Sequence, residues 1–222
     1  MEESFYFHDL GRIAYPDALN VQTTAFNALL NAKAQGLDGV NNLFFCEHDP
    51  VFTLGKNGQP TNLLIPQALL EEKGIAFYHT NRGGDITYHG PGQITGYPVF
   101  DLEVFRIGLR QYIERLEEIM IRFLALYGLH GERLSGATGV WLDAETKHAR
   151  KICAIGVKSS RFVTMHGFAL NIQTDLSYYS LIHPCGMTDK GVTSLAAELR
   201  ECPDFETTKQ QLHLLFASMF DH

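Results

Sequence analysis

The sequence predicts an α+β fold in which a mixed sheet is covered by helices. Apolar residues at helical spacing occur near both ends and in the middle of the chain, with short apolar or β-branched segments mainly between them. Consecutive strands of this kind differ from the regular βαβ alternation of a parallel sheet. No repeat, low-complexity tract or Pro/Ser-rich linker divides the chain, so we predict a single domain over residues 1–222.

The individual elements follow from local patterns. Pro16 and Asp17 predict the start of a helix over residues 16–35, and a longer amphipathic helix is predicted from Phe105 to Tyr127, ending at Gly128. A last helix is predicted over residues 205–220. The strands, each bounded by Gly, Pro, Asn or Asp, are predicted at residues 42–46, 75–79, 94–100, 139–143, 151–158 and 162–172.

Composition excludes several classes of protein. Lys plus Arg number 18 against 25 Asp plus Glu, a net charge of −7, which argues against a general nucleic-acid-binding protein. The N-terminal segment carries acids before any basic residue and has no long apolar run, so we expect no signal peptide, no membrane span and a cytoplasmic location. Cys46, Cys153, Cys185 and Cys202 show no CxxC spacing, which predicts free thiols and no metal site.

A glycine-rich segment from Arg82 to Gln93 interrupts the regular pattern. It contains four glycines and a proline, interleaved with arginine, histidine, tyrosine and glutamine. Glycine allows positive φ and a close approach of a ligand to the backbone, so we expect a loop that wraps a substrate with its N–H groups pointing inward. The alternative is a plain surface turn.

A second segment, residues 147–161, concentrates positive charge. It holds five of the 18 Lys and Arg residues and no acid. Two interpretations stay open at this point: a strand edge guarded by lysines, or a surface that docks an acidic partner.

A third segment places Cys185 between Pro184 and Gly186. This predicts a cysteine in a turn, whereas Cys153, flanked by Ile152 and Ala154, is typical of a buried structural thiol. A free thiol is mostly protonated at neutral pH, so a nucleophilic Cys185 needs a nearby cation. The pattern alone does not name that cation.

Together these segments resemble the lipoyl(octanoyl) transferases of lipoate biosynthesis. The resemblance covers about residues 45–195 and departs from the family at Lys158-Ser159 and at Thr138, where proline is frequent. The matching motifs are Glu47-His48 to Gly55-Lys56, RGGxxTYHGPGQ at Arg82 to Gln93, Tyr97-Pro98, Gly139-Val140-Trp141, the family's KIAxIGV at Lys151 to Val157, HGxALN at His166 to Asn171, and Pro184-Cys185-Gly186.

The resemblance implies a function. It implies transfer of an octanoyl group from octanoyl-acyl carrier protein to a specific lysine of lipoyl domains in 2-oxoacid dehydrogenases and of the glycine cleavage H protein. It implies Cys185 as the nucleophile, Lys151 as the residue that lowers its pKa, no cofactor or metal, and the catalytic-domain fold of biotin and lipoate protein ligases. The residues implied to contact substrate are Arg82, Gly83, Gly84, Asp85, Ile86, Thr87, Tyr88, His89, Ala154, Ile155, Gly156, Gly167, Phe168 and Ala169.

The implied chemistry is a ping-pong transfer through a cysteine thioester, which needs no ATP. Candidate donors to the tetrahedral oxygen are N–H groups of the glycine segment, Gly156 and Gly167. His89 and Lys151 are candidate proton carriers, although His89 alternatively fixes the loop by a hydrogen bond and Lys151 alternatively is an exposed edge residue. The expected docking face for the acidic carrier consists of Lys147, Arg150, Lys158 and Arg161.

Two other classes remain open from the sequence. An ATP-dependent lipoate or biotin ligase on the same fold would make an acyl-adenylate and would not require Cys185. A binding module would hold an acyl chain without transferring it. Transfer from an acyl-carrier thioester in the absence of ATP distinguishes both from the acyltransferase.

Overall fold

A computed structural model describes residues 4–183 and 190–221 and confirms the α+β prediction. Its main sheet is mixed: neighbouring strands are antiparallel except for β1 with β2 and β11 with β9. The order across the sheet is β1 (Tyr6–Arg12), β2 (Asn42–Glu47), β6 (Gln93–Val99), β10 (Val163–Asn171), β9 (Arg150–Ser160), β8 (Ala137–Leu142) and β7 (Glu132–Leu134), with β11 (Gly191–Val192) beside β9.

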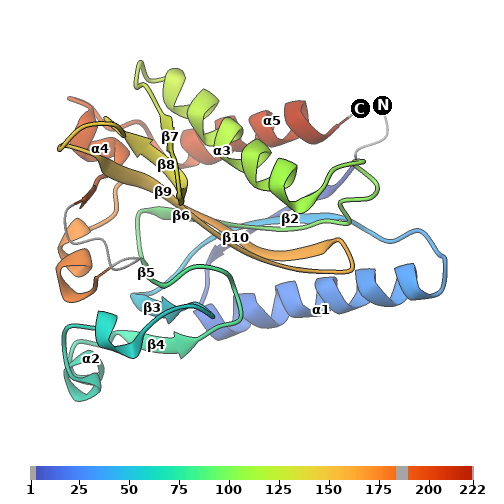
Figure 1. The fold of residues 1–222 in the computed structure, drawn as a ribbon, viewed down its shortest axis with the longest axis horizontal. Helices are drawn as coiled ribbons and strands as arrows, with labels where there is room; N and C mark the ends of the chain where they lie inside the picture. Colours follow the sequence, from blue (N-terminus) through green and yellow to red (C-terminus); the bar gives the residue numbers. More distant parts are fainter. Residues whose placement is uncertain (1–3, 184–189, 222) are drawn as a thin grey trace.

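Helices cover both faces of this sheet. Helices α3 (Leu109–Ala125) and α5 (Phe205–Phe220) lie on one face and α1 (Tyr15–Ala34) on the other, below the sheet in Figure 1. The apolar stripe of α3, including Tyr112, Leu116 and Met120, repeats at helical spacing and packs into the larger core with α5. A separate core between α1 and the sheet contains Phe26 and Leu29.

A second, three-stranded sheet lies beside the first turns of α1. Its order is β4 (Ala76–His79), β3 (Val51–Leu54) and β5 (Ile86–His89). Phe52, Leu70 and Tyr88 form its core. The remaining short elements are a 3₁₀ turn (Pro60–Asn62), α2 (Gln67–Glu72), a second 3₁₀ turn (Leu176–Leu181) and α4 (Leu195–Glu198).

The predicted helices and strands are present with small shifts of their ends. The middle helix starts at Leu109 rather than Phe105, because residues 102–107 form a turn that the Ile107 N–H to Leu102 carbonyl hydrogen bond closes. The sequence reasoning missed strands β1, β3, β5, β7 and β11 and the short helices α2 and α4. Strand β5 was expected as loop: residues 86–89 of the glycine-rich segment pair with β3, so only the part before Ile86 and the turn after His89 are irregular.

The guarded-edge interpretation of the basic segment 147–161 is wrong for the first part of β9, whose residues 150–153 pair with β8. Beyond Cys153 the pairing with β8 ends, and the Val157 carbonyl there accepts from Gly83 of the glycine-rich segment. The four proposed docking residues are spread along the length of β9 rather than clustered at one point. Lys147 precedes β9 and Arg161 follows its 11 residues, a rise of about 36 Å. Arg150 forms ion pairs with Asp143 and Glu198, and the Lys158 Nζ lies over the Phe26 ring, 5.0 Å from its centroid.

Over residues 4–183 and 190–221, no helix is long and apolar enough to cross a membrane. Cys46, Cys153 and Cys202 are free thiols, the first two buried. The segment that contains Cys185 lies outside the described residues.

Candidate active site

A cavity of about 470 Å³ lies between the main sheet and the glycine-rich segment. Its wall includes Lys151 and the predicted substrate-contacting residues, with two exceptions. Cys185 lies outside the described residues. Tyr88 lies outside the cavity, because strand alternation turns it away from Thr87 and His89 into the small core. There its ring is 1% exposed and stacks on Tyr178 at a centroid distance of 4.5 Å.

The floor of the cavity is built from small residues in register across three strands. Ala169 of β10 pairs with Thr95 of β6 on one side and with Ala154 of β9 on the other. All three line the cavity, so they form a shallow trough across the sheet. Gly167 and Gly156 form the next paired row, in which Tyr97 of β6 also lines the cavity. We call the row Thr95, Ala169 and Ala154 the acyl trough.

Residues of opposite parity on these strands face the larger core. Phe168 borders the cavity, but its ring stacks on Phe216 and packs edge-on against Phe45. The same ring covers Gly96, where any Cβ would lie 2.1 Å from it. The aromatic residue thus fixes the sheet beneath the cavity rather than filling the trough.

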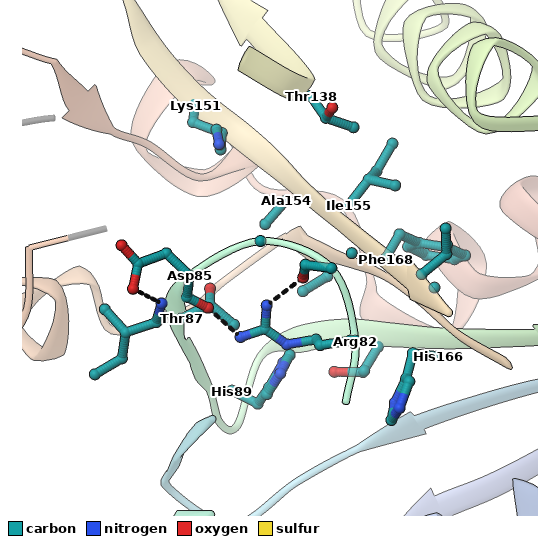
Figure 2. A pocket seen from close by; sticks show the side chains of 18 of the residues that line it. Arg82, Asp85, Thr87, His89, Thr138, Lys151, Ala154, Ile155, His166 and Phe168 are labelled. Carbon is teal, nitrogen blue, oxygen red and sulfur yellow. Dashed lines mark hydrogen bonds between the residues drawn. The ribbon is translucent and has the colours of Figure 1, made fainter. Parts of the chain in front are cut away.

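Arg82 holds the glycine-rich segment in its curved shape. Its guanidinium donates to the Thr53 carbonyl at 2.6 Å, to the Asp85 carbonyl at 2.7 Å and to the Gly83 carbonyl at 2.9 Å, inside the curve seen in Figure 2. Gly83 in turn donates its N–H to the Val157 carbonyl. This close approach requires glycine at position 156, because a Cβ there would lie 2.8 Å from the Gly83 carbonyl oxygen.

His89 is a neutral, hydrogen-bonded part of the wall. The Gln93 amide donates to the Tyr88 carbonyl and to Asn171 Oδ1, which leaves its oxygen to accept from His89 Nδ1 at 2.9 Å. His89 Nε2 then accepts from the Thr53 hydroxyl at 3.3 Å. Burial, together with the charges of His48 and Arg82, lowers the pKa of His89 well below its usual value. This geometry favours the loop-fixing role over the role of proton carrier.

His166 links three parts of the site. Its backbone has φ 57°, a left-handed conformation in the middle of β10. Its N–H donates to Gln22 of α1, and its Nε2 lies 2.9 Å from Asn81 Oδ1, directly before Arg82. Burial, with the positive charges of Arg82 and Lys158 acting in the same direction, lowers the pKa of His166 from 6.5 to about 3. The ring is therefore uncharged at neutral pH.

Lys151 lies on the half-exposed side of the cavity. Its Nζ is 4.6 Å from the centroid of the Trp141 ring, a cation–π contact, and its side chain is labelled in Figure 2. On the other side of β9, Val192 of β11 pairs with Lys151. Arg150, the preceding residue, makes a bidentate bond to Glu198 with both distances 2.6 Å. These pairings fix the backbone that carries the ammonium group.

The register also decides which backbone N–H groups face the cavity. Gly83 donates to Val157, and Gly156 pairs with Gly167 in the β9–β10 ladder, so these predicted donors are already used. The Val157 carbonyl, which accepts from Gly83, points away from β10. Residues two apart in a strand direct their backbone groups to the same side, so the Ile155 N–H also points away from β10. Strand β8 no longer pairs there, since its last pair with β9 is Val140 with Cys153. The Ile155 N–H is therefore the candidate donor to a substrate oxygen.

Several wall residues were missed by the sequence reasoning. Thr95 and Tyr97 alternate on strand β6, and the period of two in residues 93–99 is a signal that would have found them. Tyr15 of α1 and Leu109 at the start of α3 also line the cavity and were also missed. In the described part of the chain, no cluster of three or more His, Cys, Asp or Glu side chains is arranged to hold a metal ion.

Comparison with known proteins shows the family. The family model of the lipoyl protein ligase A/B catalytic domain matches residues 14–217. A protein named Octanoyltransferase from Parabacteroides distasonis is 70% identical over 219 residues, covering 98% of this chain and 99% of that protein. The chain belongs to the octanoyltransferase family.

Solved structures of more distant proteins share the fold of this octanoyltransferase-family chain. A lipoate protein ligase described as putative, Ta0514 from T. acidophilum, superposes with a TM-score of 0.70 at 13% identity, covering 97% of this chain and 84% of that one. Biotin protein ligase from Aquifex aeolicus superposes with a TM-score of 0.55 at 10% identity, covering 97% and 70%. The predicted ligase-type fold is confirmed.

Proposed function

We propose that this chain transfers an octanoyl group from octanoyl-acyl carrier protein to a lysine of lipoyl domains, through a thioester on Cys185. The proposed acceptors are the lipoyl domains of 2-oxoacid dehydrogenases and the glycine cleavage H protein, and the proposed location is the cytoplasm. The observation that carries this proposal is the acyl trough of small residues in a cavity whose wall also includes Lys151. The name of the 70% identical relative supports it.

The position of the described flanks supports Cys185 as the nucleophile. His183 donates its N–H to the Asn62 carbonyl, and the Asn62 side chain donates to Asp85 of the cavity wall at 2.6 Å. The chain immediately before the proposed nucleophile is therefore anchored to a residue of the cavity wall. On the other flank, Val192 pairs with Lys151.

The first half-reaction forms the acyl-enzyme. The Cys185 thiolate, stabilised by the Lys151 ammonium, forms a carbon–sulfur bond with the octanoyl carbonyl carbon. The Ile155 N–H donates to the carbonyl oxygen as negative charge develops on it. When the tetrahedral intermediate collapses, the carrier's sulfur leaves as a thiolate and takes a proton from Lys151. Lys151 is then neutral.

The second half-reaction uses that neutral amine. The acceptor lysine forms a carbon–nitrogen bond with the thioester carbon, Lys151 takes the proton that this nitrogen loses, and the Cys185 thiolate leaves. The ammonium–thiolate pair is thereby restored. One thioester is exchanged for another and then for a more stable amide, so no step consumes ATP.

Transfer from octanoyl-acyl carrier protein to an isolated lipoyl domain, with and without ATP and magnesium, tests the proposal. We expect equal transfer in both conditions and none with free octanoate. Transfer that depends on ATP and uses free octanoate would assign the chain to the ligases instead. Cys185→Ala should abolish transfer, whereas Cys153→Ala, which alters a buried thiol of the core, should retain it.

A further inference from the structure

We infer that Tyr15 closes the inner end of the acyl trough and so sets the longest acyl chain that the enzyme accepts. The inference rests on the proposed function and names the acyl length of its substrate. Sequence reasoning gave Tyr15 no role.

The cavity has an open side and a closed side. Leu109, at the start of α3, is 40% exposed, and Thr138 and Gly84 are also exposed. At the opposite side Tyr15 is 4% and Tyr97 3% exposed, and Thr95 is fully buried. Lys151 is half-buried, so the reacting carbonyl belongs near the open side and the hydrocarbon tail points inward, where burial stabilises it.

The trough has the length of a medium acyl chain. It runs across β9, β10 and β6 from Ala154 through Ala169 to Thr95, which is two strand spacings or about 10 Å. The seven carbon–carbon bonds of an extended octanoyl group, each about 1.5 Å in a zigzag, advance roughly 9 Å. An octanoyl tail thus ends near Thr95, and the next paired residue in the row, Cys46 of β2, is buried behind it.

Tyr15 stands across this end of the trough. Its ring packs between two histidines, 5.5 Å from His48 and stacked 6.2 Å from His89. Both histidines are tied to β6, His48 through the Tyr97 hydroxyl at 2.7 Å and His89 through Gln93. Tyr15 is the first residue of α1, and its ring packs against the two histidines at the end of the trough. It therefore forms the end wall of the trough.

Tyr15 is also the wall residue that can be changed most cleanly. Its side chain makes no hydrogen bond within the described residues, whereas Tyr97 and His89 each belong to the polar network. Replacing Tyr15 with leucine therefore removes part of the wall without leaving a buried polar partner unpaired. Tyr78 provides a matched control, because its ring packs on Tyr15 at 5.3 Å but does not line the cavity.

The test is the rate of acyl transfer from hexanoyl-, octanoyl-, decanoyl- and dodecanoyl-carrier, expressed as ratios within each variant. Misfolded protein lowers the rate with every donor by the same factor, so the ratio of two rates within one variant does not depend on it. One additional buried methylene is worth about fourfold. Tyr15→Leu should thus raise the decanoyl-to-octanoyl ratio about fifteenfold relative to wild type. Tyr15→Trp should lower the octanoyl-to-hexanoyl ratio, and Tyr15→Phe and Tyr78→Leu should leave all ratios within twofold.

Two results would overturn the inference. One is an unchanged set of ratios in both Tyr15→Leu and Tyr15→Trp. The other is a shift in Tyr78→Leu as large as that in Tyr15→Leu, which would assign the effect to general loosening. If Tyr15→Leu does not fold, the opposite shift expected for Tyr15→Trp decides. Failure of the proposed function is seen separately, as absence of ATP-independent octanoyl transfer by the wild type.

Discussion

Replacing His166 with asparagine should flatten the dependence of stability on pH. His166 is 2% exposed, and burial, reinforced by Arg82 and Lys158, lowers its pKa from 6.5 to about 3. Below pH 6.5 the unfolded chain binds a proton at this residue and the folded chain does not, so acidification favours unfolding until the pH reaches about 3. The contribution of neutral His166 is therefore complete above pH 6.5 and is lost progressively below it.

The magnitude follows from the size of this window. Each unit of pKa difference corresponds to about 1.4 kcal/mol, so moving from pH 7 to pH 5 costs the wild type about 2 kcal/mol through His166. Asparagine does not titrate, and it tolerates the positive φ of this position better than most residues. The free energy of unfolding of His166→Asn should then fall about 2 kcal/mol less over the same interval.

Urea unfolding at pH 7, 6 and 5 measures this difference. Each protein is compared with itself at pH 7, so the stability that His166→Asn loses through packing does not enter the result. Parallel pH profiles for the two proteins would refute the reasoning, because they would mean that His166 binds its proton equally in the folded and unfolded chains.

Three further changes have defined outcomes. Lys151→Met should slow iodoacetamide alkylation of Cys185 at neutral pH, with recovery at higher pH as the thiol ionises, and overlapping rate profiles would remove Lys151 from thiolate stabilisation. Gly156→Ala should lower kcat/KM at least tenfold, because the added Cβ, 2.8 Å from the Gly83 carbonyl oxygen, must displace the glycine-rich segment; unchanged kinetics would contradict this. Arg150→Gln should cost about 1 kcal/mol of stability in thermal or urea unfolding by breaking its partly exposed pair with Glu198, and no loss would show the pair to be neutral.

Motif and composition were sufficient to predict the main parts of the fold and most of the residues named for substrate contact that line the cavity. Segments with a clear period, such as the stripe of α3 and the strand at residues 163–171, formed the expected elements because a buried face leaves little choice of structure. The glycine-rich segment was predicted to turn its N–H groups toward a substrate, but the Gly83 N–H donates to the Val157 carbonyl of β9.

The missed features depend on pairing between distant segments. Nothing local to Thr95 indicates that it lies beside Ala169, and Tyr15 meets the cavity only because α1 packs under the sheet. The assignment of Gly156 and Gly167 as donors failed for the same reason, because whether their N–H groups are free depends on the register of β9 with β10. The basic residues of the segment 147–161 are spread out because β9 is 11 residues long and separates Lys147 from Arg161.

The central claim, a thioester on Cys185 beside the acyl trough, is tested most directly by intact-mass measurement. The protein is mixed with octanoyl-acyl carrier protein without ATP or acceptor and then digested to locate the modification. The account predicts one added octanoyl group on the peptide that contains Cys185, removed by neutral hydroxylamine and absent in Cys185→Ala. An octanoyl group on another residue, or one retained by Cys185→Ala, would contradict it.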